Sequence, residues 1–174
     1  MRQTGFTLIE AMIVIALISI ILSIAAPSLR NMMQDSRLAS ASEEMLTSMM
    51  LARTEAIKRN ARVMLCNSSD PAATSASCVT SSPDWKTGWL VFVDKDADNT
   101  FSTGDEILRV VNVVEKVGSI APSDTTLTNV RFRSVLNQAS KDVSFTFCTS
   151  GQRSRVVTLD KTSRVNRTIG SACT

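Results

Sequence analysis

Apolar residues follow three successive patterns along this chain. Between residues 6 and 26 almost every position is apolar, with one charged residue and three hydroxyl side chains among 21 positions. Between residues 38 and 56 apolar residues recur every three or four positions, which is typical of a helix with one buried face. Beyond residue 61 they occur in short runs of the kind that forms β-strands. This order predicts one long helix followed by a series of strands.

The first apolar run is long enough to cross a membrane, because a helix rises about 1.5 Å per residue and the hydrocarbon layer is roughly 30 Å thick. Its one charged residue, Glu10, costs on the order of 3 kcal/mol when ionised in lipid, which indicates a functional role with a partner. A secretory signal, with Arg2 at its charged end and cleavage after Ser23-Ile24-Ala25, would have a shorter apolar core without an acid. A plain membrane anchor also leaves Glu10 unexplained.

The second pattern predicts that the helix continues past Pro27 to about Asn60, since no glycine interrupts the chain between residues 5 and 88. A helix of this length is a rod of about 80 Å. The apolar positions of its buried stripe are Leu38, Ala41, Met45, Met49, Ala52 and Ala56. The polar positions expected on the opposite side are Gln34, Asp35, Arg37, Glu43, Glu44 and Arg53.

The third pattern predicts strands at residues 62–66, 89–93, 107–114, 130–133, 143–148, 156–159 and 165–169. One long helix followed by a run of strands indicates the α+β class, with an antiparallel β-sheet packed against the helix. At 174 residues, the chain has room for one small globular domain beyond the helix.

Composition and charge narrow the possible functions. Histidine is absent, which removes the commonest general base and the commonest zinc ligand, and tyrosine is absent too, so an aromatic platform for stacking bases is not expected. Residues 129–174 carry eight basic and two acidic side chains, a net charge of +6, whereas the remainder carries 11 basic and 14 acidic side chains, a net charge of −3. The sequence therefore predicts a protein that is not an enzyme, with a basic C-terminal third.

Four cysteines follow the apolar run, and an even number in an exported domain indicates disulfides, with three possible connectivities. We favour the sequential pairs Cys66–Cys78 and Cys148–Cys173, because each closes a loop beside a strand. Each such bond would stabilise the fold by roughly 3 kcal/mol in the chain-entropy description. A metal site is the alternative, but no CxxC spacing and no histidine supports it.

An acidic segment joins the second and third predicted strands. Asp94, Asp96, Asp98 and Asp105 occupy positions 1, 3, 5 and 12 of a spacing like that of calcium-binding loops. The segment departs from that motif at position 6, which is Asn99 rather than glycine, and strands rather than helices flank it. The alternative is a solvated hairpin turn in which Asn99 and Gly104 supply unusual backbone angles. We therefore expect no cofactor and keep calcium as the weaker possibility.

The start of the chain carries a family resemblance. Gly5-Phe6-Thr7-Leu8-Ile9-Glu10 resembles the processing site of type IV prepilins and type II secretion pseudopilins. The resemblance implies that a prepilin peptidase cuts after Gly5 and N-methylates Phe6. Glu10, as the fifth mature residue, would then neutralise the freed amine of its own or a neighbouring subunit and set the register between subunits, a role that suits a buried charge pair.

A second resemblance narrows the family. The segments 51–60, 88–92 with Asp94, and 104–109 are similar to the GspH/FimT group of minor pilins and minor pseudopilins. This resemblance implies the pilin fold, with a prepilin leader at 1–5, a transmembrane segment at 6–26, an amphipathic helix at 27–60 and a globular β-rich domain at 61–174.

Basic side chains near the C-terminus are a candidate DNA-binding site. The side chains are Arg153, Arg155, Lys161, Arg164 and Arg167. Clustered arginines can bind phosphates without reading sequence, and some FimT-like pilins that take up DNA carry a Gly-Arg-x-Arg element. Here Gln152 is inserted after Gly151, so the match is partial. The alternative is a solvated face, or contact with acidic patches on neighbouring pilins.

The resemblance implies a minor type IV pilin that takes part in pilus assembly or initiation near the filament tip. It would begin as a single-pass protein of the inner membrane with a periplasmic domain and then join a filament at the cell surface. Its partners would be other pilins, the prepilin peptidase and the membrane. The two alternatives are a minor pilin that binds DNA during natural transformation and a minor pseudopilin of a type II secretion system.

Overall fold

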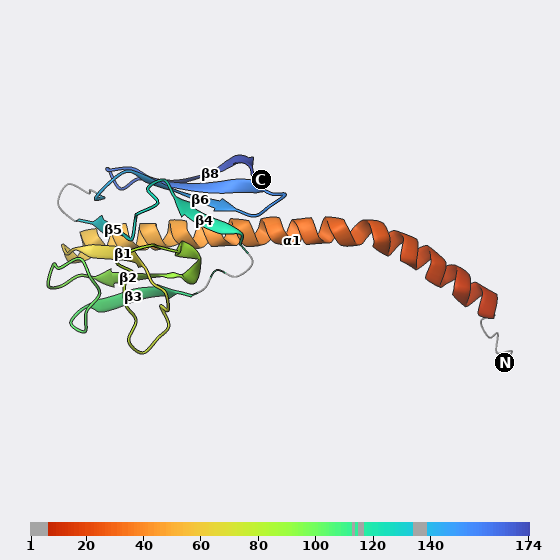
Figure 1. Cartoon of the computed structure of the whole chain (residues 1–174), viewed down its shortest axis with the longest axis horizontal. Helices are drawn as coiled ribbons and strands as arrows, with labels where there is room; N and C mark the ends of the chain where they lie inside the picture. Colours follow the sequence, from red (N-terminus) through yellow and green to blue (C-terminus); the bar gives the residue numbers. More distant parts are fainter. Residues whose placement is uncertain (1–6, 113, 115–116, 134–138) are drawn as a thin grey trace.

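The computed structural model describes the chain from Thr7 onward, except for residues 113, 115–116 and 134–138. The described chain begins with one long helix and continues into strands that form two antiparallel sheets (Figure 1). The elements are α1 (Leu8–Arg59), β1 (Val63–Asn67), η1 (Trp85–Thr87), β2 (Trp89–Val93), β3 (Glu106–Val111), β4 (Ser119–Pro122), β5 (Asn129–Phe132), β6 (Val143–Cys148), β7 (Arg153–Leu159) and β8 (Val165–Ala172). This arrangement confirms the α+β class.

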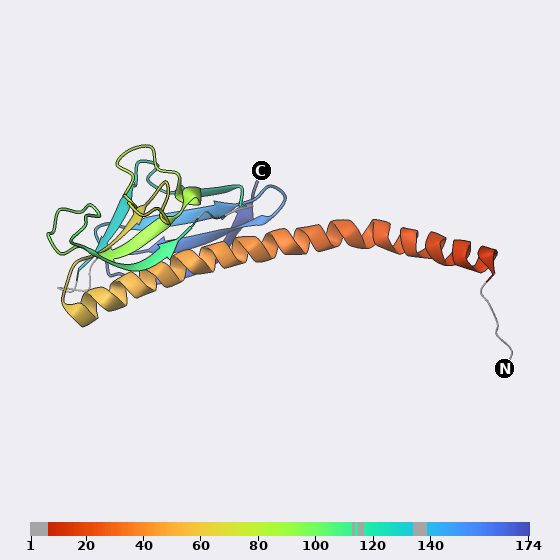
Figure 2. The same cartoon turned by 90° about the horizontal axis from the view of Figure 1, so that it is seen from below.

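Helix α1 runs without interruption for 52 residues. Thr7 caps its start, because the Thr7 hydroxyl accepts a hydrogen bond from the backbone N–H of Glu10. Asn60 ends the helix in the left-handed conformation, at φ 47°, which is a common helix terminator. Pro27 lies inside the helix, which curves gently and extends far beyond the sheets (Figure 2). The two predicted helical segments are therefore one continuous element.

The C-terminal half of α1 lies under both sheets with one buried face. The buried residues are Leu38, Ala41, Ser42, Met45, Ser48, Met49, Ala52 and Ala56. All six apolar positions expected in the stripe are buried. The two serines were not expected there, and they fit because each hydroxyl bonds back to a helical carbonyl, Ser42 to Ala39 and Ser48 to Glu44.

The strands form two four-stranded sheets rather than the single sheet that the sequence suggested. Their orders are β3-β2-β1-β5 and β4-β6-β7-β8. Every predicted strand is present, with shifts at the ends; the third stops at Val111, and residue 113 of its predicted range lies outside the described residues. The sequence analysis missed β4, a four-residue edge strand that ends in Pro122, where proline is tolerated because it faces no further strand.

Strands β1 and β2 are buried on both faces, which explains why they read as continuous apolar runs. One face packs on α1 within the main core. The other face carries Met64, Cys66, Leu90 and Phe92, against which Ala76, Cys78 and Phe101 pack. The Cys66–Cys78 disulfide joins β1 to the covering loop.

Ser48 has a second role that suggests a test of the helix–sheet interface. The indole N–H of the fully buried Trp89 donates to Ser48 Oγ at 3.0 Å. Replacing Ser48 by alanine leaves this buried donor without a partner, which is expected to reduce the free energy of unfolding by ~1–3 kcal/mol. The matched variant Ser42→Ala, whose hydroxyl bonds only within the helix, should lose clearly less, and equal losses in urea unfolding would contradict the role of Ser48.

Candidate assembly surface

The N-terminal half of α1 presents an apolar surface on every side. Its exposed large side chains are Leu8, Ile9, Met12, Ile13, Val14, Ile15, Leu17, Ile18, Ile20, Ile21, Leu22, Ile24, Leu29, Met32 and Met33. The most apolar 18-residue window of the helix has a mean hydropathy of 2.7, and none of it is buried. By length and composition this is a helix that could cross a membrane. A surface of this size requires lipid or other helices to cover it.

Glu10 lies in the first turn of α1, inside this apolar surface. Its backbone N–H bonds to the Thr7 hydroxyl, but from Thr7 onward no described side chain bonds to its carboxylate. Gly5 and Phe6, the residues expected at the processing site, lie outside the described residues. In the sequence, Glu10 follows the expected new N-terminus, Phe6, by four positions.

The outer face of the C-terminal half of α1 is weakly polar. Its exposed positions include Ser36, Ser40, Glu43, Met50, Thr54 and Ile57, spaced along one side of the helix. A shallow groove of about 480 Å³ runs along Met50, Arg53, Thr54, Ile57 and Lys58. The charged side chains on this side are Glu43 and, along the groove, Arg53 and Lys58. The small hydroxyl and flexible apolar side chains between them permit close approach of another helix.

Acidic residues of α1 bind both sheets. Asp35 meets Arg155 of β7 at 2.6 Å, and Glu43 meets Arg167 of β8 at 2.7 Å. On the other sheet, Glu44 meets Arg109 of β3 at 2.6 Å. These ion pairs hold the helix against both sheets. The three acids were expected on the polar side of the helix, opposite the buried stripe, and the structure pairs them with arginines of the sheets.

A further link joins the end of α1 to β3. Arg59 donates to Glu55 one turn back and to Glu106 of β3 at 2.7 Å. The hydrogen bond from Arg59 lowers the pKa of Glu55, and the bond to Glu106 raises the pKa of Arg59. Both shifts favour the charged forms, so this pairing persists at neutral pH.

Four of the five basic side chains proposed for DNA have partners within the chain. Arg155, with only 12% of its side chain exposed, and Arg167 are paired with Asp35 and Glu43 of α1. Arg153 donates to the Gly170 carbonyl, and Lys161 lies 3.9 Å from Asp142. The acidic contacts that the sequence analysis assigned to neighbouring subunits are thus supplied, for two of the arginines, by the chain's own helix.

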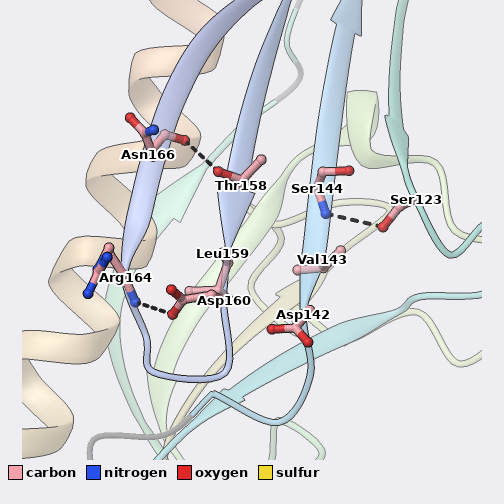
Figure 3. A pocket seen from close by; sticks show the side chains of 9 residues that line it. All are labelled: Ser123, Asp142, Val143, Ser144, Thr158, Leu159, Asp160, Arg164 and Asn166. Atoms are coloured by element: carbon pink, nitrogen blue, oxygen red, sulfur yellow. Dashed lines mark hydrogen bonds between the residues drawn. The ribbon is translucent and has the colours of Figure 1, made fainter.

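Arg164 lies at a groove of about 520 Å³ at one end of the β4-β6-β7-β8 sheet. Figure 3 shows its backbone N–H meeting Asp160 while its guanidinium points away from that carboxylate. Asp142 and Asp160 line the same groove, together with hydroxyl and amide side chains and the apolar Val143 and Leu159. The groove is therefore of mixed charge, which does not favour a phosphate backbone.

The acidic hairpin between β2 and β3 differs in part from expectation. Carboxylate oxygens of Asp94, Asp96 and Asp98 lie within 4.8 Å of one another. Asp105 lies outside this cluster, because its two oxygens accept from the backbone N–H groups of Lys95 and Ser102, at 2.9 and 2.8 Å. The positive φ angles fall at Ala97 and Asn99, whereas Gly104, expected to have one, does not.

The cysteines form the two expected disulfides. Cys66 pairs with Cys78 and Cys148 with Cys173, with Cα–Cα distances of 5.7 and 5.6 Å. The second bond holds the C-terminus to the end of β6. With all four cysteines paired, the chain offers no free thiol for nucleophilic chemistry, and the bonds indicate an oxidising compartment.

Two family models match the chain. The model described as "Type II transport protein GspH" matches residues 41–163, and the model described as "Prokaryotic N-terminal methylation motif" matches residues 1–26. The first match covers the buried face of α1 from Ala41 onward and every strand described except β8. The second covers the apolar half of α1 and the segment before it.

Comparison with individual proteins also finds similarity to pilins. The chain is 31% identical over 108 residues to the "Pilin-like protein PilA1" of Thermus thermophilus, a match that covers 61% of this chain and 58% of that protein. Two crystal forms of the type IV minor pilin FimU of Pseudomonas aeruginosa share the fold, with TM-scores of 0.57 and 0.55 at 16% identity. They cover 80% and 78% of this chain and 97% and 99% of the FimU chains.

Proposed function

The chain belongs to the GspH family of minor type IV pilins and pseudopilins, and from this premise we propose that it is a membrane-anchored minor pilin that helps to assemble or initiate a type IV pilus near its tip. The observation that carries the proposal is the exposed apolar half of α1, most of which lies within the match to the N-terminal methylation motif. The family and fold are those of structural proteins, so the function is assembly rather than catalysis.

The first step is processing at the membrane. A prepilin peptidase cuts between Gly5 and Phe6 and methylates the new amine, which leaves α1 spanning the inner membrane with the domain in the periplasm. The two disulfides support the periplasmic location, because such bonds persist in oxidising compartments.

The second step is the transfer of α1 from lipid to a bundle of pilin helices. The apolar half exchanges lipid contacts for helix contacts at little cost, since lipid tails are as apolar as the neighbouring side chains. Transfer to the bundle lowers the free energy of the Glu10 carboxylate most, because an unpaired carboxylate is costly in lipid and a subunit amine in the bundle neutralises it. Its pairing therefore fixes the axial position of one subunit against the next.

The third step is packing of one subunit's globular domain, with the adjoining half of α1, against the neighbouring subunits. The outer face of α1 between Ser36 and Ile57 carries small hydroxyl and apolar side chains besides Glu43 and Arg53. Asp35, Glu43 and Glu44 are already bound to arginines of the sheets. Neutralised in this way, these acids do not repel an approaching helix. The partners proposed are other major and minor pilins.

The alternatives differ in partner. A type II secretion pseudopilin would use the same helix and the same processing, so the two roles are separated by whether deletion of the gene abolishes pili or secretion. DNA uptake would need the basic side chains on one free surface, and the pairing of Arg155 and Arg167 with α1 gives that role no support.

Processing is tested on protein extracted from membranes. Mass spectrometry and N-terminal sequencing should find a chain that begins with methylated Phe6. A Gly5→Val variant should keep residues 1–5, because it replaces the residue after which the peptidase is proposed to cut. Ser28→Ala, beyond the motif, should be processed normally. A wild-type chain that begins at Ala26, after a signal-peptide cut following Ala25, or one that retains Met1, would contradict the proposal.

A further inference from the structure

We propose that the hairpin between β2 and β3 binds one calcium ion through Asp94, Asp96 and Asp98. The hairpin lies at the end of the molecule far from the N-terminus (Figure 1). Asp94 directly follows β2, and the other two acids follow at alternate positions of the turn. This role is separate from assembly through α1, so a failure of either proposal leaves the other standing.

The three carboxylates already have the spacing of a coordination shell. Their oxygens lie within 4.8 Å of one another. Calcium holds its oxygen ligands at about 2.3–2.6 Å, so two ligands on opposite sides of the ion are separated by about 5 Å. A single ion can therefore contact all three groups after at most a small movement of the two exposed side chains.

A buried oxygen without a partner gives an independent reason to expect a ligand. The side chain of Asp94 is 0% exposed. Its Oδ2 accepts from Arg62 Nη1 and from the backbone N–H of Asn99, both at 3.3 Å, whereas its Oδ1 has no hydrogen-bond partner. The two oxygens share one carbon, so Oδ1 lies in or directly beside the cluster. A buried carboxylate oxygen left without a donor or cation is unfavourable, and a bound cation removes that penalty.

The remaining hydrogen bonds of the cluster leave room for an ion. Asp96 accepts from the backbone N–H of Asp98 and the Ser102 hydroxyl at 3.3 and 3.4 Å, and Asp98 accepts twice from Thr100. Because each carboxylate oxygen has two lone pairs, one hydrogen bond does not exclude a metal.

Arg62 is the main competitor for the site. Its Nη1 donates to Asp94 Oδ2, to the Ala97 carbonyl at 2.6 Å and to Asn99 Oδ1 at 3.3 Å. Arg62 therefore braces the turn from the Oδ2 side and leaves Oδ1 unused. A second arginine, Arg131, donates to Asn99 Oδ1 at 2.9 Å. The four aspartates of the hairpin carry −4 and Arg62, Lys95 and Arg131 supply +3, so the hairpin keeps a net negative charge that attracts a cation.

The donor set selects the kind of ion. All three ligands are carboxylates, which favours hard cations over zinc or copper. Calcium accepts an irregular shell completed by water, whereas magnesium demands near-ideal octahedral geometry. Two of the three acids are exposed, so water can fill the open positions. The affinity expected for such a site outside the cytoplasm is a Kd of about 0.1–1 mM.

The test is calcium titration of the full-length protein in detergent micelles after removal of divalent ions with a chelator. Isothermal titration calorimetry should detect one calcium site, and the thermal midpoint should rise with calcium concentration as mass action requires. Magnesium should bind at least ~10-fold more weakly, because the site cannot offer an octahedral shell. Equal effects of the two ions would indicate general screening of acidic charge and would overturn the proposal.

Variants locate the ion. Asp96→Asn with Asp98→Asn keeps the size of two exposed side chains and removes two charges, so affinity should fall by more than ~10-fold. Asp124→Asn is the matched control, because Asp124 accepts from the N–H and hydroxyl of Thr126 just as Asp98 does from Thr100, but it does not belong to the carboxylate cluster. The control should bind calcium as wild type does. Absence of binding by the wild-type protein at 10-fold above the expected Kd, or unchanged binding by the double variant, would refute the site.

Discussion

A Glu10→Ala variant is expected to be cut after Gly5 as well as wild type, yet to reach sheared filaments at a level reduced at least ~10-fold. The loss corresponds to about 1.4 kcal/mol or more in the preference of the subunit for its place in the bundle. The carboxylate lies inside the exposed apolar half of α1, where an unpaired charge costs on the order of 3 kcal/mol. Alanine removes both the cost of the charge in lipid and the favourable free energy of pairing the carboxylate with a subunit amine. The driving force for a defined register between subunits therefore disappears.

Two further variants separate charge from shape. Glu10→Gln keeps the size of the side chain without its charge and should be almost as defective as alanine. Ser19→Ala removes another polar group of the same helical half, one whose hydroxyl bonds only to the Ala16 carbonyl at 2.7 Å, and should incorporate normally. Immunoblots of cleaved protein in membranes and in sheared filaments measure both steps. Normal incorporation of fully cleaved Glu10→Ala would overturn the register role.

The helix was predictable because its determinants are local. Apolar spacing identified Leu38, Ala41 and Met45 as buried, and the first break in helical composition placed the end near Asn60. Strands β2 and β6 were also predicted with the observed bounds, since short apolar runs between turn residues identify them. The division of the strands into two sheets depends on pairings between distant segments, such as β1 with β5, that no local pattern encodes.

In the candidate sites too, contacts between residues close in the sequence were predictable and contacts between distant residues were not. The disulfides were predictable because each pair closes a short segment, 12 and 25 residues apart. The pairing of Arg155 with Asp35 was not, because 120 residues separate the two. A run of arginines in the sequence indicates an electrostatic surface only if the fold leaves those side chains free, and here the fold brings acids of α1 to two of them.

Trp85 is a core residue that the sequence analysis missed, since it lies alone in a polar loop rather than in an apolar run. It is fully buried, its ring meets Phe145 edge-on at 4.8 Å between centroids, and its indole N–H donates to the Leu127 carbonyl at 3.0 Å. A Trp85→Ala variant is therefore expected to lose ~3–5 kcal/mol of unfolding free energy, because it removes a large ring and leaves a cavity. Urea unfolding in micelles, followed by the fluorescence of Trp89, measures the loss.

The reason for this large effect is the position of the ring between the sheets. Phe145 belongs to β6, whereas Leu127 precedes β5 of the other sheet, so Trp85 joins the two. Trp85→Phe keeps an aromatic ring but loses the indole hydrogen bond, and an intermediate loss of ~1–3 kcal/mol is expected. Phe101→Ala, in the smaller cluster outside the β1–β2 face, should cost less than Trp85→Ala, because Phe101 is only partly buried. If Phe101→Ala proved the more damaging change, the contact between the two sheets could not be the main support of the domain, and the loop-covered face would have to take that role.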